Sequence, residues 1–162
     1  MSSQGRANCF DASALVKLYT EEMGSDIVRT YFDREPTKYA TPFCFYEALN
    51  VLKVKWKYRN EITRDEYLDA AFRLTAWFDA MSGYIDDIEF LSPQTFVEAK
   101  HLVEQTGLDL SDAFQILSVK AGYYSGMTGG SSTILVTCDR DLASAARAEG
   151  LRVWYCLEEQ AP

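Results

Sequence analysis

Short apolar runs alternate with helical patterns along this chain, and that alternation restricts its possible folds more than any other feature. Runs typical of strands cover residues 7–10, 38–41, 88–91, 134–137 and 152–155, and helical patterns fill the intervals. Strands separated by helices favour βαβ units and a parallel sheet. Right-handed crossovers then place helices on both faces, so we expect an α/β protein, a three-layer α/β/α sandwich around a parallel sheet of about five strands.

Helix starts are marked by capping patterns. Thr41-Pro42 combines an N-cap threonine with proline at the first helical position. Residues 63–66, Thr-Arg-Asp-Glu, form a capping box. The 162 residues contain no repeat or low-complexity linker, and this length fits one domain better than two. We therefore expect residues 1–162 to form a single domain.

The cysteines and the N-terminus predict a reduced intracellular protein. The four cysteines are widely spaced without a Cys-x-x-Cys, and the chain has one histidine, so a zinc site is not expected. Each cysteine lies in an apolar run, and we interpret Cys9, Cys44, Cys138 and Cys156 as reduced, buried thiols. No apolar stretch is long enough to span a membrane, and no apolar segment typical of a signal peptide follows the N-terminus. We expect a cytoplasmic location.

Two acidic residues come at the ends of expected strands. Asp11 directly follows the run 7–10, and Asp139 comes just after the run 134–137. Ligands of parallel α/β sheets bind beyond the carboxyl ends of the strands, so both side chains are expected in one crevice. A structural interpretation stays open, because a helix follows each aspartate and each can be its N-cap.

Two further acidic residues lie within helical patterns. Glu47 is in the second turn of the helix that begins at Pro42, in an apolar stretch where an unpaired carboxylate is costly to bury. It can equally face solvent. Asp112 falls in the first turn of a helix that begins near Ser111, where the helix dipole alone favours an acid. Asp109 is nearby and competes with Asp112 for either role.

Carboxylates that converge without histidine or cysteine suit a hard cation. Oxygen ligands favour Mg²⁺ or Mn²⁺ over zinc. Such an ion lowers the pKa of a bound water and neutralises charge on a phosphodiester. This kind of electrostatic catalysis needs no histidine base. The residues therefore point to metal-assisted chemistry on phosphate esters.

Four segments resemble the motifs of PIN-domain ribonucleases, in particular the VapC-type toxins of toxin–antitoxin pairs. Asp11–Tyr19, Asp-Ala-Ser-Ala-Leu-Val-Lys-Leu-Tyr, is similar to the opening motif of the family. Tyr46–Leu49 resembles the second motif, Leu110–Ala113 the third and Val136–Leu142 the fourth. The four occur in the order of the family and span nearly the whole chain.

The resemblance implies a Mg²⁺- or Mn²⁺-dependent endoribonuclease, a hydrolase of RNA phosphodiester bonds. It also implies a homodimer and inhibition by a cognate antitoxin protein. The catalytic and metal-binding residues that it implies are Asp11, Glu47, Asp112 and Asp139, supported by hydrogen bonds from Ser13 and Thr137. Asp141 either adds an outer carboxylate or only caps its helix.

Net charge runs against nucleic-acid binding. The chain carries a formal charge of −8, whereas phosphate rewards positive charge. Lys53 and Lys57 follow Glu47 along its helix, among aromatic residues that can stack on bases. Lys17 and Arg140 lie close in sequence to the strand-end aspartates. We take these four basic residues as candidate RNA contacts, although a solvated helix end explains the first two equally well.

Two other functions remain open. One is a Mg²⁺-dependent phosphatase or phosphotransferase, but Ser13 stands where haloacid-dehalogenase-type phosphatases carry a second aspartate, and the chain has no P-loop. The other is a PIN-like domain that binds RNA or a protein without cleavage. Metal-dependent cleavage of RNA separates the nuclease from the binding domain, and phosphate release from small esters would favour the phosphatase.

Overall fold

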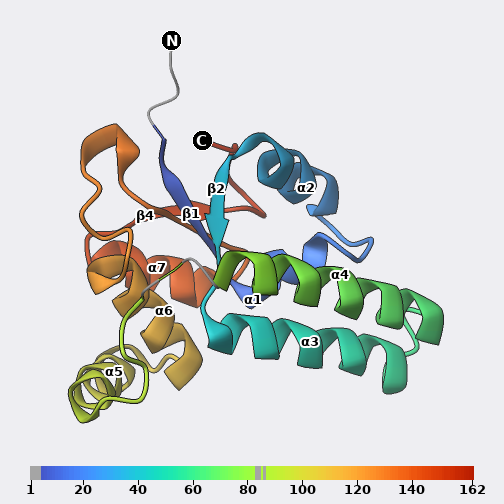
Figure 1. The fold of residues 1–162 in the computed structure, drawn as a ribbon, viewed down its shortest axis with the longest axis horizontal. Helices are drawn as coiled ribbons and strands as arrows, with labels where there is room; N and C mark the ends of the chain where they lie inside the picture. Colours follow the sequence, from blue (N-terminus) through green and yellow to red (C-terminus); the bar gives the residue numbers. More distant parts are fainter. Residues whose placement is uncertain (1–4, 83–84, 86) are drawn as a thin grey trace.

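A computed structural model of the chain describes residues 5–82, 85 and 87–162. Its centre is a parallel sheet with the strand order β2-β1-β3-β4 (Figure 1). The strands are β1 (Ala7–Phe10), β2 (Thr37–Tyr39), β3 (Ile134–Thr137) and β4 (Arg152–Tyr155). The predicted α/β class and parallel sheet are confirmed.

Helices cover both faces of this sheet and complete the predicted three layers. One apolar cluster joins the first face to the helices α1 to α4, and a second joins the opposite face to α5, α6 and α7. Strand residues alternate between the two clusters, as Cys9 and Phe10 do in β1. The helices are α1 (Ala12–Lys17), α2 (Ser25–Arg34), α3 (Pro42–Lys57), α4 (Arg64–Ser82), α5 (Pro93–Thr106), α6 (Leu110–Ala121) and α7 (Arg140–Ala148).

The predicted strand at residues 88–91 is wrong, so the described part of the chain has four strands where about five were expected. This segment is irregular and ends in a turn at Phe90 and Leu91. The Phe90 ring contacts the rings of Phe43 and Phe114 from α3 and α6. The run is therefore apolar because it packs against helices. A short apolar run cannot by itself distinguish that environment from a strand.

The helix starts are confirmed in detail. Thr41 caps α3, because its Oγ1 accepts a hydrogen bond from the Cys44 amide at 3.3 Å. Thr63 and Glu66 form the reciprocal capping box before α4, with N···O distances of 2.6 and 3.2 Å. The caps bind backbone N–H groups that lack a helical partner, so local sequence fixes where each helix begins. In the described residues, no helix has the length and apolar character needed to cross a bilayer.

The cysteines divide into two pairs. Cys9 and Cys44 are buried and free, as predicted. Cys138 and Cys156 form a disulfide, so the prediction of reduced thiols is wrong for these two. The register of β3 and β4 is the physical reason. Thr137 lies opposite Tyr155, so the next residue of each strand faces its counterpart, with a Cα–Cα distance of 5.3 Å.

Loss of this disulfide should weaken the fold. The cross-link closes a loop with a sequence separation of 18, and its removal by Cys138→Ser with Cys156→Ser should lower the free energy of unfolding. The chain-entropy model gives about 3 kcal/mol for a loop of this size. Urea unfolding with and without dithiothreitol measures the loss, and the double variant should not respond to the reductant. Equal stability of the native protein in both conditions would contradict the prediction.

Candidate acidic site at the carboxyl edge of the sheet

Asp11 is the best-anchored acidic residue at this edge. Its side chain is only 4% exposed, and its amide donates to the Val136 carbonyl at 2.9 Å, just past the end of β1. Oδ2 accepts hydrogen bonds from Ser13 Oγ at 2.5 Å and from Thr137 Oγ1 at 2.9 Å. Oδ1 accepts one from Gln115 Nε2 at 2.9 Å. Side chains from α1, β3 and α6 therefore fix the orientation of this carboxylate.

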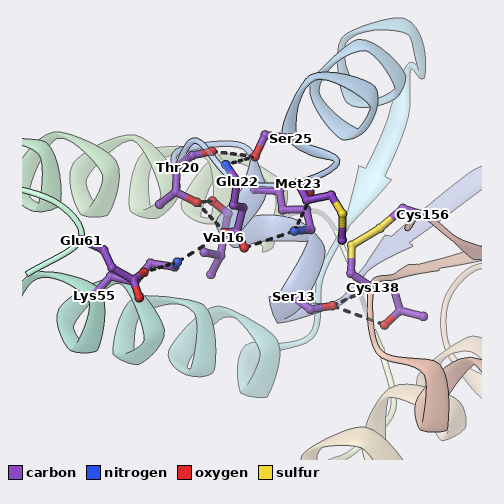
Figure 2. Close-up of polar contacts among 12 residues, drawn as sticks. Ser13, Val16, Thr20, Glu22, Met23, Ser25, Lys55, Glu61, Cys138 and Cys156 are labelled. Carbon is purple, nitrogen blue, oxygen red and sulfur yellow. Dashed lines mark hydrogen bonds and ion pairs between the residues drawn. A yellow bond between two sulfur atoms is a disulfide. The ribbon is translucent and has the colours of Figure 1, made fainter. Parts of the chain in front are cut away.

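Ser13 and Thr137 also connect Asp11 to the loop that carries Asp139. Ser13 Oγ accepts a hydrogen bond from the Cys138 amide, and Thr137 Oγ1 accepts one from the Asp139 amide, both at 2.9 Å. Figure 2 shows Ser13 beside the disulfide that fixes the same loop. Each hydroxyl thus bonds to both strand-end segments. Whether they support a bound metal stays a prediction.

Both strand-end aspartates are helix N-caps, as the structural interpretation held. The Ser13 amide donates to Asp11 Oδ2 at 3.4 Å. The amides of Asp141 and Leu142 donate to Asp139 Oδ1 at 2.8 and 3.0 Å. Asp139 is exposed, and its Oδ2 accepts no hydrogen bond from a described residue. Capping therefore leaves that oxygen open to a ligand. Asp141 is exposed in the first turn of α7.

Glu47 and Asp112 meet where α3 approaches the N-terminal end of α6. Ser111 Oγ donates to the Glu47 carboxylate at 3.5 Å. Glu47 is exposed, Asp112 is half-buried in the first turn of α6, and Asp109 is the exposed residue before that helix. The tertiary structure thus brings acidic residues of two helices to the strand-end aspartates.

The charges of these carboxylates act on one another. Burial raises the pKa of Asp112 to about 8, and the negative charges of Asp11, Glu47, Asp139 and Asp109 add to the rise in that order. Burial and then the charge of Asp11 also raise the pKa of Glu47, while the bond from Ser111 opposes this. All four predicted acidic residues therefore share one electrostatic field, and Asp109 contributes to it.

In the part of the chain that the structure describes, ion pairs do not balance this field. Among the described residues, no lysine, arginine or histidine forms an ion pair with any of the four predicted acids. Nor do three described His, Cys, Asp or Glu side chains stand close enough to hold one ion ready-made. The carboxylates therefore influence one another through their charges, but in the described residues they are not gathered around a single position. An unbalanced set of oxygen donors fits a hard divalent cation, because such an ion supplies the missing positive charge.

The four basic residues predicted to contact RNA differ in how freely their side chains could reach a phosphate. Lys17 is 5% exposed, and its Nζ donates to the Met23 carbonyl at 2.8 Å and pairs with Glu22 at 3.2 Å. Figure 2 shows Glu22 and Met23 at this contact. A phosphate contact by Lys17 would break both interactions. Arg140 is exposed and pairs with Glu158, whereas Lys53 and Lys57 are exposed on α3.

Sequence reasoning missed Gln115, which is 0% exposed and bonds directly to Asp11. The available signal was its spacing. Gln115 follows Asp112 by three residues, which places the two on neighbouring positions of one helix face. It also interrupts an otherwise apolar stretch, Ala113 to Leu117.

A comparison of the chain with protein-family models gives no match, and a comparison with curated proteins gives no significant match. The resemblance to PIN domains therefore rests on the motif residues themselves and stays a prediction.

Proposed function

We propose that this protein is a metal-dependent endoribonuclease of the PIN type that hydrolyses RNA phosphodiester bonds. One observation carries the proposal: carboxylates from four separate segments act on one another through their charges, with no ion-paired cation among the described residues, and burial together with these charges raises the pKa of Asp112 to about 8. Repulsion among these carboxylates lowers the stability of the folded protein, so it does not serve the fold. The same negative charge increases the affinity of the site for a divalent cation.

Asp11, Glu47, Asp112 and Asp139 are the residues that would hold Mg²⁺ or Mn²⁺. Bound at these oxygens, the ion supplies Lewis acidity for the phosphodiester and lowers the pKa of a water. Asp11 is oriented for this role by its hydrogen bonds, and Asp139 Oδ2 is open. The raised pKa of Asp112 means that its carboxyl keeps a proton near neutral pH and releases it when a cation binds.

Lys53 and Lys57 are the basic residues best suited to RNA. They lie one helical turn apart on α3, exposed, beyond the position of Glu47 on the same helix. The wider assignment is to the toxin of a toxin–antitoxin pair, cytoplasmic, homodimeric and inhibited by a cognate antitoxin. Motif resemblance alone supports the toxin, homodimer and antitoxin parts of this proposal, and the cytoplasmic location remains an expectation from the sequence.

Cleavage of RNA should require a divalent cation. Purified protein is incubated with mixed single-stranded and structured RNAs in Mg²⁺, in Mn²⁺ and in EDTA, and fragments are resolved by gel electrophoresis. We expect cutting with either metal and none in EDTA, because the carboxylates alone supply no positive charge to a phosphodiester. A parallel assay with p-nitrophenyl phosphate should release no phosphate.

Three outcomes would contradict this expectation. Cutting that persists in EDTA would exclude the metal mechanism. Phosphate release without RNA cleavage would favour the phosphatase. Folded protein that shifts RNA in a gel but never cuts it would be a binding domain.

A further inference from the structure

We propose that Gln115 is a positioning residue of this site, whose amide holds the Asp11 carboxylate so that Oδ1 keeps a lone pair for a divalent cation. The inference rests on the proposed function and adds a residue that the motifs do not contain. It follows from three observations on the described residues: the position of Gln115 on α6, the distribution of hydrogen bonds over Asp11, and an unpartnered oxygen.

Position comes first. Gln115 lies on α6 one helical turn after Asp112, and residues three apart share a helix face. One helix therefore contributes the carboxylate of Asp112 to the site and a side chain that donates a hydrogen bond to a second carboxylate. This hydrogen bond is buried and joins two distant parts of the chain, because Gln115 and Asp11 are 104 positions apart in sequence.

The two oxygens of Asp11 are bonded unequally. Oδ2 accepts from the hydroxyls of Ser13 and Thr137 and, at 3.4 Å, from the Ser13 amide. Among the described residues, only Gln115 donates to Oδ1. A carboxylate oxygen has two lone pairs, so Oδ2 is fully used and Oδ1 has one left. Without the amide of Gln115, nothing described would hold the Oδ1 end of the group.

Packing does not explain a glutamine here. Gln115 is 0% exposed between Phe114 and Ile116, and its Oε1 is buried without a hydrogen-bond partner among the described residues. A buried acceptor without a donor is unfavourable, and a leucine would avoid it. Turning the amide over would place Oε1 against Asp11 Oδ1, oxygen against a carboxylate oxygen. The bond from Nε2 to Asp11 is the favourable interaction that this side chain makes.

The test separates metal affinity from stability. Mn²⁺ is titrated into metal-free native protein and into Gln115→Leu, and free Mn²⁺ is followed by electron paramagnetic resonance. We expect Mn²⁺ binding to weaken by about 10-fold or more, the effect typical of residues that orient a metal ligand. Urea unfolding in EDTA measures the stability that Gln115→Leu loses, because Oδ1 of the buried Asp11 gives up its donor while the unpartnered Oε1 also leaves. Mn²⁺ binding is therefore compared at a temperature at which both proteins are folded.

A neighbouring substitution serves as the matched control. Ile116→Val also alters a fully buried side chain of α6, and Ile116 packs in the apolar cluster formed with α5 and α7. It should lower the urea midpoint and leave Mn²⁺ affinity unchanged, which shows that lost stability alone does not weaken metal binding.

The results distinguish this inference from the proposed function. Native protein that binds Mn²⁺ and a Gln115→Leu variant that binds it equally well would overturn the positioning role and leave the metal site standing. Native protein that binds no Mn²⁺ would overturn both. Weaker binding by folded Gln115→Leu, with the Ile116→Val control unchanged, supports the role.

Discussion

Asp11→Asn should reduce metal-dependent RNA cleavage by about 1,000-fold, the scale of losing a main electrostatic group of an active site. The substitution keeps the shape of the side chain and removes its negative charge. That charge belongs to the carboxylate with the most protein hydrogen bonds at this edge of the sheet, where Ser13, Thr137 and Gln115 all donate to it. Because these hydrogen bonds fix the orientation of the Asp11 carboxylate, the main effect of Asp11→Asn on metal binding should come from the lost negative charge.

Folding of the variant must be measured as well, because Asp11 is also a structural acceptor. An asparagine amide would place an NH₂ group against either Gln115 Nε2 or the hydroxyls of Ser13 and Thr137, which already accept from backbone amides. We expect a loss of about 1–3 kcal/mol of stability from this mismatch. Cleavage is therefore compared at a temperature at which circular dichroism shows both proteins folded.

Asp65→Asn is the matched control for this experiment. Asp65 is an exposed residue in the first turn of α4, so its replacement removes one charge without touching the acidic site. Its cleavage rate should equal that of the native protein. Folded Asp11→Asn that cleaves at the native rate would place the reaction elsewhere on the molecule.

The metal-free protein should lose stability as the pH rises from about 4 to about 8, the window between the ordinary and the folded pKa of Asp112. In this window the folded state holds a proton that the unfolded state has released, so rising pH favours unfolding. Glu47, whose pKa is also raised, acts in the same direction. Asp112→Asn removes the main contribution and should gain about 1–3 kcal/mol at pH 8, after a discount for partial exposure to solvent.

Urea unfolding in EDTA at pH 5, 6.5 and 8 measures this effect. The difference between the native protein and Asp112→Asn isolates Asp112 from carboxylates whose pKa is lowered, such as Glu22 and Glu35. Mg²⁺ should recover stability at pH 8 in the native protein and recover less in the variant, because an ion that binds only the folded state stabilises it by mass action. Parallel pH profiles for the two proteins would show that Asp112 is not held in the field described above.

Local patterns predicted most of the elements. The runs at 7–10, 134–137 and 152–155 became β1, β3 and β4, and β2 lies slightly earlier than its predicted range. Capping residues act on amides a few positions away, so Thr41 and Thr63 could be recognised without the fold. The segment 88–91 could not, because Phe90 is apolar for partners on α3 and α6 that are distant in sequence.

By itself the sequence determined the parallel α/β order and placed Asp11 and Asp139 at strand ends, because strand ends and helix caps depend on neighbouring residues. Only the tertiary structure decided what these side chains contact. Asp11 takes its donors from Gln115 and Thr137, 104 and 126 positions away, and strand register pairs Cys138 with Cys156. Contacts of this kind depend on how layers and strands are brought together, which no local pattern encodes.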